Sequence, residues 1–193
     1  WFLINFVANW LAGIIGSYAE SLGELAIFGG LAATLFIFAV VLWLLSGLYI
    51  IDPAERGVVL RFGQFQRITL EGPRWHFPYP IERVEKINVD SIRTSTHKGL
   101  MLTRDENIVN VEVAVQYRVA DAQHFLFNVR EPEGTLRDAT ISAVREVIGT
   151  SAMDFVLGEG RSEVAARTQD LLQKTLDSYG TGLVVTSVNL QDA

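Results

Sequence analysis

The sequence predicts an α+β fold, in which a membrane-spanning helix precedes a compact domain of mixed antiparallel strands and packed helices. Three observations predict it. All 16 Lys and Arg, and every one of the 22 Asp and Glu except Glu20 and Glu24, lie beyond residue 51 of the 193. Residues 102–121 alternate with a period of two, which is typical of a half-buried strand. Beyond them the apolar spacing becomes helical, and strands followed by helices and one last strand favour α+β over a doubly wound sheet.

The uncharged stretch 25–51 is the predicted transmembrane helix. At 1.5 Å per residue it measures roughly 40 Å, enough to cross a hydrocarbon core of about 30 Å with some tilt. Trp43 and Tyr49 lie near its downstream end, where amphipathic rings favour the membrane interface. A buried core helix is the alternative. A cleaved signal peptide is disfavoured, because the apolar run is long and no small-residue cleavage site follows it.

Residues 1–24 form a second apolar segment, in which polar and small residues recur every three or four positions. These are Asn5, Asn9, Gly13, Ser17 and Glu20. The spacing favours an amphipathic helix that lies on the membrane or is embedded in it. A second span is the rival interpretation. Because the chain begins with Trp1 rather than Met, we expect further sequence upstream.

Residues 52–193 are the predicted folded domain. A turn at Asp52-Pro53 leads into a short strand over 58–62, and a weakly alternating strand is expected within 84–98. Between them, 70–84 is rich in proline, which predicts an extended loop. Three aromatic residues of this loop are expected to pack over the domain core, to touch the bilayer surface, or both. They are Trp75, Phe77 and Tyr79.

The alternating strand within 102–121 follows a polar hairpin turn and has two unlike faces. One face is apolar and should support the later helices. It comprises Val109, Val111, Val113, Val115, Tyr117 and Val119. The polar residues of the other face are left for solvent or for contact with a neighbouring subunit. They are Asn110, Glu112, Gln116 and Arg118.

Three helices and a final strand are predicted after residue 121. Asp121 should cap a short helix. Apolar stripes predict two longer helices over 132–149 and 160–180. The first stripe is Leu136, Ala139, Ala143, Val147 and Ile148, and the second is Val164, Thr168, Leu171, Leu172, Thr175 and Tyr179. The β-branched residues of 182–190 predict a strand.

No pattern in the sequence assembles a catalytic, cofactor or metal site. Cysteine is absent, which removes disulfides, thiolates and Cys-ligated metals. His76, His97 and His124 lack metal-ligand spacing, and neither a phosphate loop nor a nucleophile elbow occurs. Ser95 near Lys98 and the pair Asp105-Glu106 read as polar turns. The chain has more acidic than basic residues and no basic stripe, which disfavours nucleic acid as a partner. We therefore predict a non-enzymatic protein.

Several separated stretches resemble the SPFH (band 7, prohibitin-homology) family in order and spacing, over roughly residues 47–193. They are 54–65, 72–89, 102–119, 136–149 and 182–191. Within the family, 101–119 and 142–161 are most similar to the bacterial branch that pairs with HflC. The resemblance implies a single-pass protein of the bacterial inner membrane with its SPFH domain in the periplasm. It also implies a coiled coil beyond Ala193.

The resemblance further implies a large hetero-oligomeric ring or cage with an HflC-like subunit around an FtsH-like AAA+ membrane protease, whose substrate access it controls. A stomatin- or flotillin-like organiser of membrane lipid is the alternative, and a serine hydrolase using Ser95 or Ser151 is a third hypothesis.

The charge pattern favours the opposite membrane orientation to the periplasmic one that the resemblance implies. Arginines follow the apolar run and none precede it, which by the positive-inside rule favours the cytoplasm. The periplasm remains our expectation, since long domains translocate largely regardless of charge.

Overall fold

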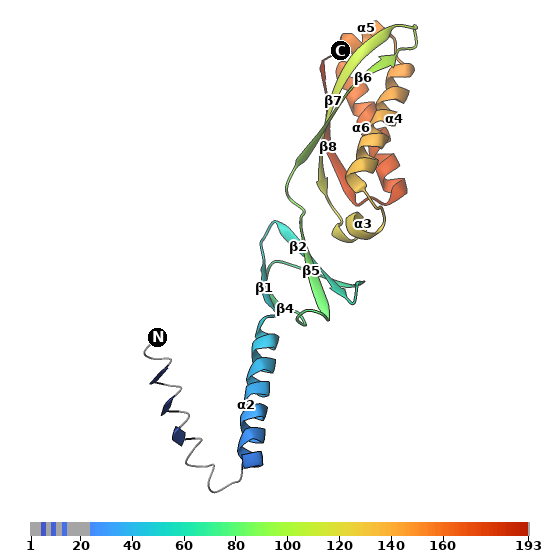
Figure 1. Cartoon of the computed structure of the whole chain (residues 1–193). Helices are drawn as coiled ribbons and strands as arrows, with labels where there is room; N and C mark the ends of the chain where they lie inside the picture. The colour runs from blue at the N-terminus through green and yellow to red at the C-terminus, as the bar shows by residue number, and fades with distance from the viewer. Residues whose placement is uncertain (1–4, 7–8, 11–12, 15–23, 193) are drawn as a thin grey trace.

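The computed structural model describes residues 5–6, 9–10, 13–14 and 24–192. The predicted amphipathic segment 1–24 lies largely outside the described residues. Figure 1 shows three regions in line: the apolar helix α2 (Glu24–Leu45), a group of short strands, and a sheet covered by helices. The predicted fold class, an apolar helix followed by a mixed strand-and-helix domain, is confirmed.

Helix α2 is shorter than the predicted span 25–51, because it ends at Leu45 and Leu48–Ile51 form strand β1. Hydropathy does not distinguish a helix from a strand, whereas the aromatic and β-branched residues of β1 favour the strand. Within the described residues, Phe28–Leu45 is long and apolar enough to cross a membrane, with a mean hydropathy of 2.4. The 22 residues of α2 measure about 33 Å, which still matches the hydrocarbon core.

We call residues 48–88 the proximal module, since it directly follows α2. Strand β1 pairs with β4 (Gly72–Trp75), and β2 (Glu55–Arg61) lies between β3 (Gln64–Thr69) and β5 (Glu82–Asn88). The prediction of a loop throughout 70–84 was therefore wrong for Gly72–Trp75 and for residues 82–84, where β5 begins. Proline is tolerated there because β4 belongs to a two-stranded sheet, in which each strand has a free edge.

We call residues 93–192 the distal module. Its antiparallel sheet has the order β6 (Arg93–Leu102), β7 (Ile108–Val119) and β8 (Leu183–Asp192). The predicted strand within 84–98 is therefore two strands, β5 and β6. The hairpin turn expected before β7 is confirmed, and β7 is the central strand of this sheet.

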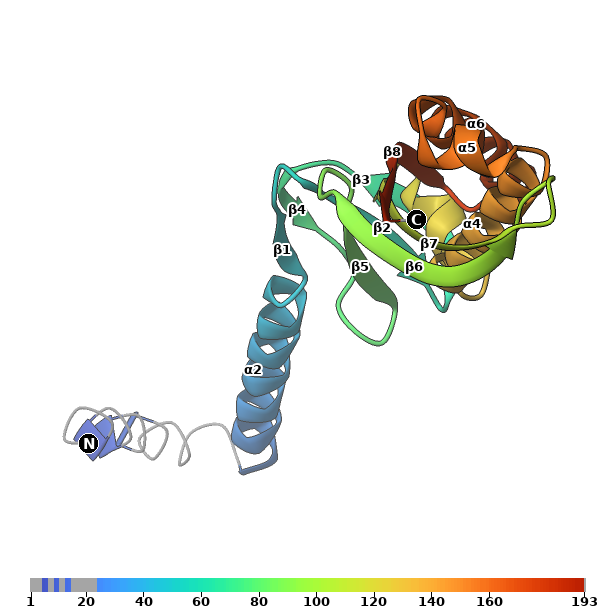
Figure 2. The same cartoon turned by 90° about the horizontal axis from the view of Figure 1, so that it is seen from above.

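Four helices complete the distal module: α3 (Ala122–Phe127), α4 (Pro132–Gly149), α5 (Met153–Leu157) and α6 (Arg161–Tyr179). Helices α4 and α6 lie on one side of the sheet (Figure 2). As predicted, Asp121 caps α3 by accepting hydrogen bonds from the backbone of Gln123 and His124. Helix α5 was not predicted from the sequence, because it is too short to show a periodic pattern.

The apolar face of β7 forms the centre of the core, as its alternation predicted. Val111, Val115 and Val119 have no exposed surface, and they belong to one cluster with Leu136 of α4 and Leu172 of α6. The stripe predicted for α6 was wrong at Tyr179, which is 57% exposed. The buried residues of α6 follow four-residue steps instead. They are Val164, Thr168, Leu172 and Leu176.

Candidate functional site

The end of α2 is joined to the proximal module by two indole hydrogen bonds. Trp43 Nε1 donates to the Tyr79 carbonyl at 3.0 Å, and Trp75 Nε1 donates to the Leu44 carbonyl at 2.9 Å. The Leu44 carbonyl, in the last turn of the helix, also accepts a hydrogen bond from the Gly47 backbone at 3.2 Å, so the Trp75 bond is a second one that joins it to β4. We call this contact region the junction.

Glycine at position 47 permits the close approach at the junction. The Gly47 carbonyl accepts a hydrogen bond from the His76 backbone at 3.0 Å. A Cβ atom at Gly47 would lie only 2.1 Å from the His76 carbonyl oxygen. Any side chain at this position would therefore push the end of the helix away from His76. The sequence shows only a glycine after an apolar run, and its partner lies far along the chain.

The structure brings all five predicted membrane-interface residues to the junction or next to it. Trp75 and Phe77 pack edge to face with ring centroids 4.9 Å apart. Trp43 is partly exposed, and Tyr79 is 81% exposed. Tyr49 differs, since it lies half-buried in β1 and its hydroxyl donates to Thr69 Oγ1 at 3.1 Å. Contact of these rings with lipid stays a prediction.

A buried carboxylate lies behind the aromatic rings. Glu82 accepts hydrogen bonds from Arg61 at 2.7 and 3.0 Å and from the Phe77 backbone at 3.0 Å, and Arg67 lies 3.7 Å away. Burial acts to raise the pKa of Glu82, but the Arg61 and Phe77 hydrogen bonds and the charge of Arg67 hold it below its usual value. Sequence reasoning missed Glu82, because its partners come from separate strands.

The predicted subunit-contact residues alternate along β7 with the buried residues that pack against α4 and α6, so they lie on the opposite face of the distal sheet. Glu112 pairs with Lys98 at 3.4 Å, and Gln116 accepts a hydrogen bond from the Ser187 hydroxyl at 3.1 Å. Asn110 and Arg118 are exposed. We call this surface the open face. Its role in subunit contact stays a prediction.

Three exposed apolar residues extend the open face toward the tip of the β6–β7 hairpin. Leu100 is 73% exposed and Ile108 is 72% exposed, and Leu102 is the direct cross-strand partner of Ile108. These three residues were not predicted as contact residues, although Leu100 and Leu102 stand two apart, as residues on one face of a strand do. The open face is therefore partly apolar as well as polar.

Two of the serine and carboxylate candidates, Ser151 and Asp105, form hydrogen bonds that hold the fold. The Ser151 hydroxyl is buried and donates to the Val147 carbonyl at 2.7 Å. Ser95 and Lys98, three positions apart on β6, point to opposite faces. Asp105 accepts hydrogen bonds from the Met153 backbone and the Asn107 amide. The Thr103 hydroxyl bond is the main reason that the pKa of Asp105 lies below its usual value.

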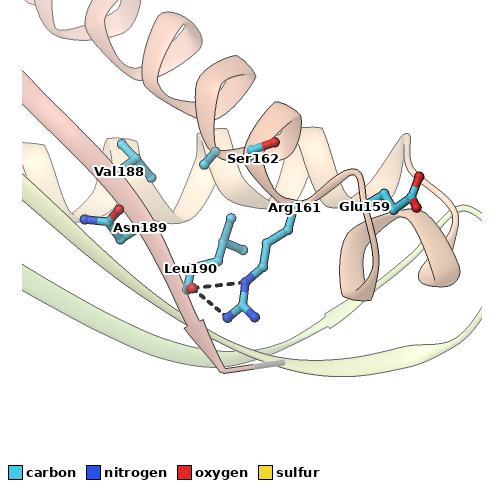
Figure 3. A pocket seen from close by; sticks show the side chains of 7 residues that line it. Glu159, Arg161, Ser162, Val188, Asn189 and Leu190 are labelled. Carbon is cyan, nitrogen blue, oxygen red and sulfur yellow. Dashed lines mark hydrogen bonds between the residues drawn. The ribbon is translucent and has the colours of Figure 1, made fainter.

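A hollow of about 400 Å³ lies between the start of α6 and the end of β8 (Figure 3). Its one guanidinium group, Arg161, points at the strand and donates to the Leu190 carbonyl at 3.1 and 2.6 Å and to the Gln191 carbonyl at 2.6 Å. These bonds tie α6 to β8. Among the described residues, no group of three or more His, Cys, Asp and Glu is placed to hold a metal ion.

An apolar helix long enough to cross a membrane, an aromatic junction and a domain with an open sheet face fit a single-pass membrane module of the SPFH type. The SPFH domain / Band 7 family matches residues 49–193, and the chain belongs to this family. The family predicted from the sequence is confirmed.

The chain is also similar to proteins of the predicted bacterial branch. It is 47% identical to Protein HflK of Vibrio parahaemolyticus over 157 residues, which is 81% of this chain and 39% of that protein. It is 43% identical to Modulator of FtsH protease HflK of Escherichia coli over 166 residues, which is 86% of this chain and 39% of that protein. The match thus spans about two-fifths of the length of these relatives.

Proposed function

We propose that this chain is a non-catalytic scaffold subunit of the bacterial inner membrane, with its SPFH domain in the periplasm. Together with an HflC-like subunit it builds a large hetero-oligomeric ring or cage around an FtsH-like AAA+ protease and controls which membrane substrates reach it. Similarity to a protein named as a modulator of FtsH protease supports this role. No cofactor is required of the chain, since zinc and ATP chemistry belong to the protease.

The junction is the observation on which the proposal mainly rests. A wall of subunits excludes substrates only if each domain keeps a fixed position relative to the membrane. Two indole hydrogen bonds and the close Gly47–His76 contact link the end of α2 to the proximal module at several points. The helix and the domain therefore move together, as a steric barrier requires.

The open face supplies a surface for neighbouring subunits. Its exposed residues combine polar groups such as Asn110 and Arg118 with apolar ones such as Leu100 and Ile108. Specific protein interfaces combine apolar and polar groups in this way. In the proposed cage, this face packs against the next SPFH domain.

Extraction of the native complex in mild detergent tests the proposal. We expect this chain to co-purify with an SPFH partner of HflC type and an AAA+ protease in one large particle. A lone monomer, or a particle without either partner, contradicts it. Clusters that form with lipid and exclude the protease favour the stomatin- or flotillin-like organiser instead.

The absence of cysteine makes the membrane orientation directly testable. Glu159 is exposed on the distal module, so a Glu159→Cys variant carries a single thiol on the domain surface. A membrane-impermeant maleimide added to intact spheroplasts should label it if the domain is periplasmic. Labelling only after lysis places the domain in the cytoplasm and overturns this part of the proposal.

A further inference from the structure

Most arginines that follow α2 have a carboxylate partner within the proximal module. Arg56 lies 3.6 Å from Glu71, and both Arg61 and Arg67 lie against Glu82. Arg74 is the exception, because it is exposed and forms no ion pair within the described part of the chain. Arg61, Arg67 and Arg74 together with Glu82 leave an excess of positive charge beside the junction.

Arg74 lines a groove between β3 and β4 with a volume of about 560 Å³. Arg67, Ile68 and Leu70 contribute to one wall, and Arg74 and Trp75 to the other. Ile68 is 41% exposed, and Leu70 is also exposed. The groove is therefore lined by two arginines together with apolar residues.

The groove begins where the apolar helix ends. Trp75, which lines it, is bonded to the Leu44 carbonyl in the last turn of α2. Arg74 is the next residue along β4, about 3.3 Å further from the helix. The headgroup layer extends roughly 5–7 Å beyond the hydrocarbon core, so the groove opens at the depth of lipid headgroups.

We propose that this groove binds the phosphodiester headgroup of an anionic phospholipid. The planar Arg74 guanidinium can donate two parallel hydrogen bonds to a phosphate, and no described carboxylate competes for it. Arg67 adds a second positive charge, because its Nη2 lies 3.7 Å from Glu82 Oε2 and the two groups are only weakly paired. Ile68, Leu70 and Trp75 provide apolar surface for the glycerol and the start of the acyl chains. This inference rests on the membrane placement of α2, but not on the protease partnership.

Titration of the delipidated full chain in detergent tests the proposal, with bound lipid counted by native mass spectrometry. The ligands are phosphatidylglycerol, phosphatidylcholine and inorganic phosphate. We expect one phosphatidylglycerol to bind in preference to phosphatidylcholine, and Arg74→Gln to weaken its binding about fivefold, as expected for one arginine at a membrane surface. Arg74→Lys should show an intermediate loss, because it keeps the charge but not the bidentate geometry.

Arg83→Gln is the matched control, since Arg83 is exposed on β5, pairs with Glu85 and does not line the groove. We expect it to bind phosphatidylglycerol like the unmodified chain. Equal binding of the two lipids, or equal losses in the Arg74 and Arg83 variants, overturns the proposal. Competition by inorganic phosphate as strong as by phosphatidylglycerol identifies a free-phosphate site and also overturns it. None of these outcomes depends on co-purification with a protease.

Discussion

The proximal and distal modules are stabilised by different means. The distal module has a continuous apolar core between β7 and the helices α4 and α6, and only Val58 and Ile87 of the proximal module join this buried cluster. The proximal module buries few further apolar residues, Ile51 and Val59 among them, and has in addition indole hydrogen bonds, aromatic contacts and the buried Glu82 with its arginines. The distal core supplies most of the stability, whereas the proximal contacts set the position of the domain on its helix.

The largest expected effect is in the distal core. Leu172 has no exposed surface, so Leu172→Ala leaves a cavity and should lower the free energy of unfolding by about 2–5 kcal/mol. Urea unfolding of the detergent-solubilised chain measures the loss. Leu100→Ala makes the same chemical change at an exposed position and should cost less than about 0.5 kcal/mol. Similar costs at the two sites contradict the proposed difference between buried and exposed positions.

Removal of the buried carboxylate should weaken the proximal module alone. Glu82→Gln leaves Arg61 and Arg67 without their counter-charge, and because both arginines are partly exposed we expect a cost of about 1–3 kcal/mol. Hydrogen exchange should accelerate in β2 and β3 and stay slow in β7. Glu85→Gln, which breaks the exposed pair with Arg83, is the control and should change little. Faster exchange in β7 to the same degree means that the modules do not respond separately.

A smaller effect is expected at the junction. Trp75→Phe keeps an aromatic ring but removes the hydrogen bond to the Leu44 carbonyl, which should cost about 0.5–1.5 kcal/mol. The amides of residues 46–48 should exchange faster as a result. Tyr79 contributes its backbone carbonyl rather than its hydroxyl, so Tyr79→Phe serves as the control. If both variants exchange alike, the indole bond does not hold the helix end.

The smallest expected effect is a difference in acid sensitivity between the modules. Burial opposes ionisation of Glu82, but its hydrogen bonds lower its pKa in the folded state. The stabilisation is therefore present above the unfolded pKa of about 4.3 and is lost as pH falls through the lower folded value. Hydrogen exchange below about pH 4 should accelerate first in β2 and β3. Glu82→Gln should remove this pH dependence, and an unchanged profile contradicts the assignment to Glu82.

Local sequence patterns predicted the distal module well, because the burial of its residues follows from their spacing along a regular strand or helix. The alternation from Val109 to Val119 follows directly from one buried face of a strand, and the spacing of Leu136 and Ala143 from one buried face of a helix. Patterns failed where structure depends on distant partners. The end of α2 is set by contacts of Gly47 and Leu44 with the 75–76 segment, and hydropathy does not encode these contacts.

The candidate site was predicted in part for the same reason. Aromatic rings near an apolar run indicate a membrane interface, so Trp43 and Trp75 were selected from the sequence. Their hydrogen bonds to backbone carbonyls were not predictable, because main-chain acceptors leave no sequence signal. In the sequence, Glu82 cannot be distinguished from a surface glutamate, because its two arginine partners lie on the separate strands β2 and β3.

The native mass of the gently extracted complex tests most directly whether the open face joins SPFH subunits into a cage. Arg118→Glu reverses a charge on the open face, and Arg137→Glu makes the same change on the exposed side of α4. We expect the Arg118 variant to fall to small species while the Arg137 variant keeps the mass of the unmodified complex. An Arg118 variant that assembles at full mass, or an equal loss in both variants, contradicts the assignment of the open face as the subunit contact.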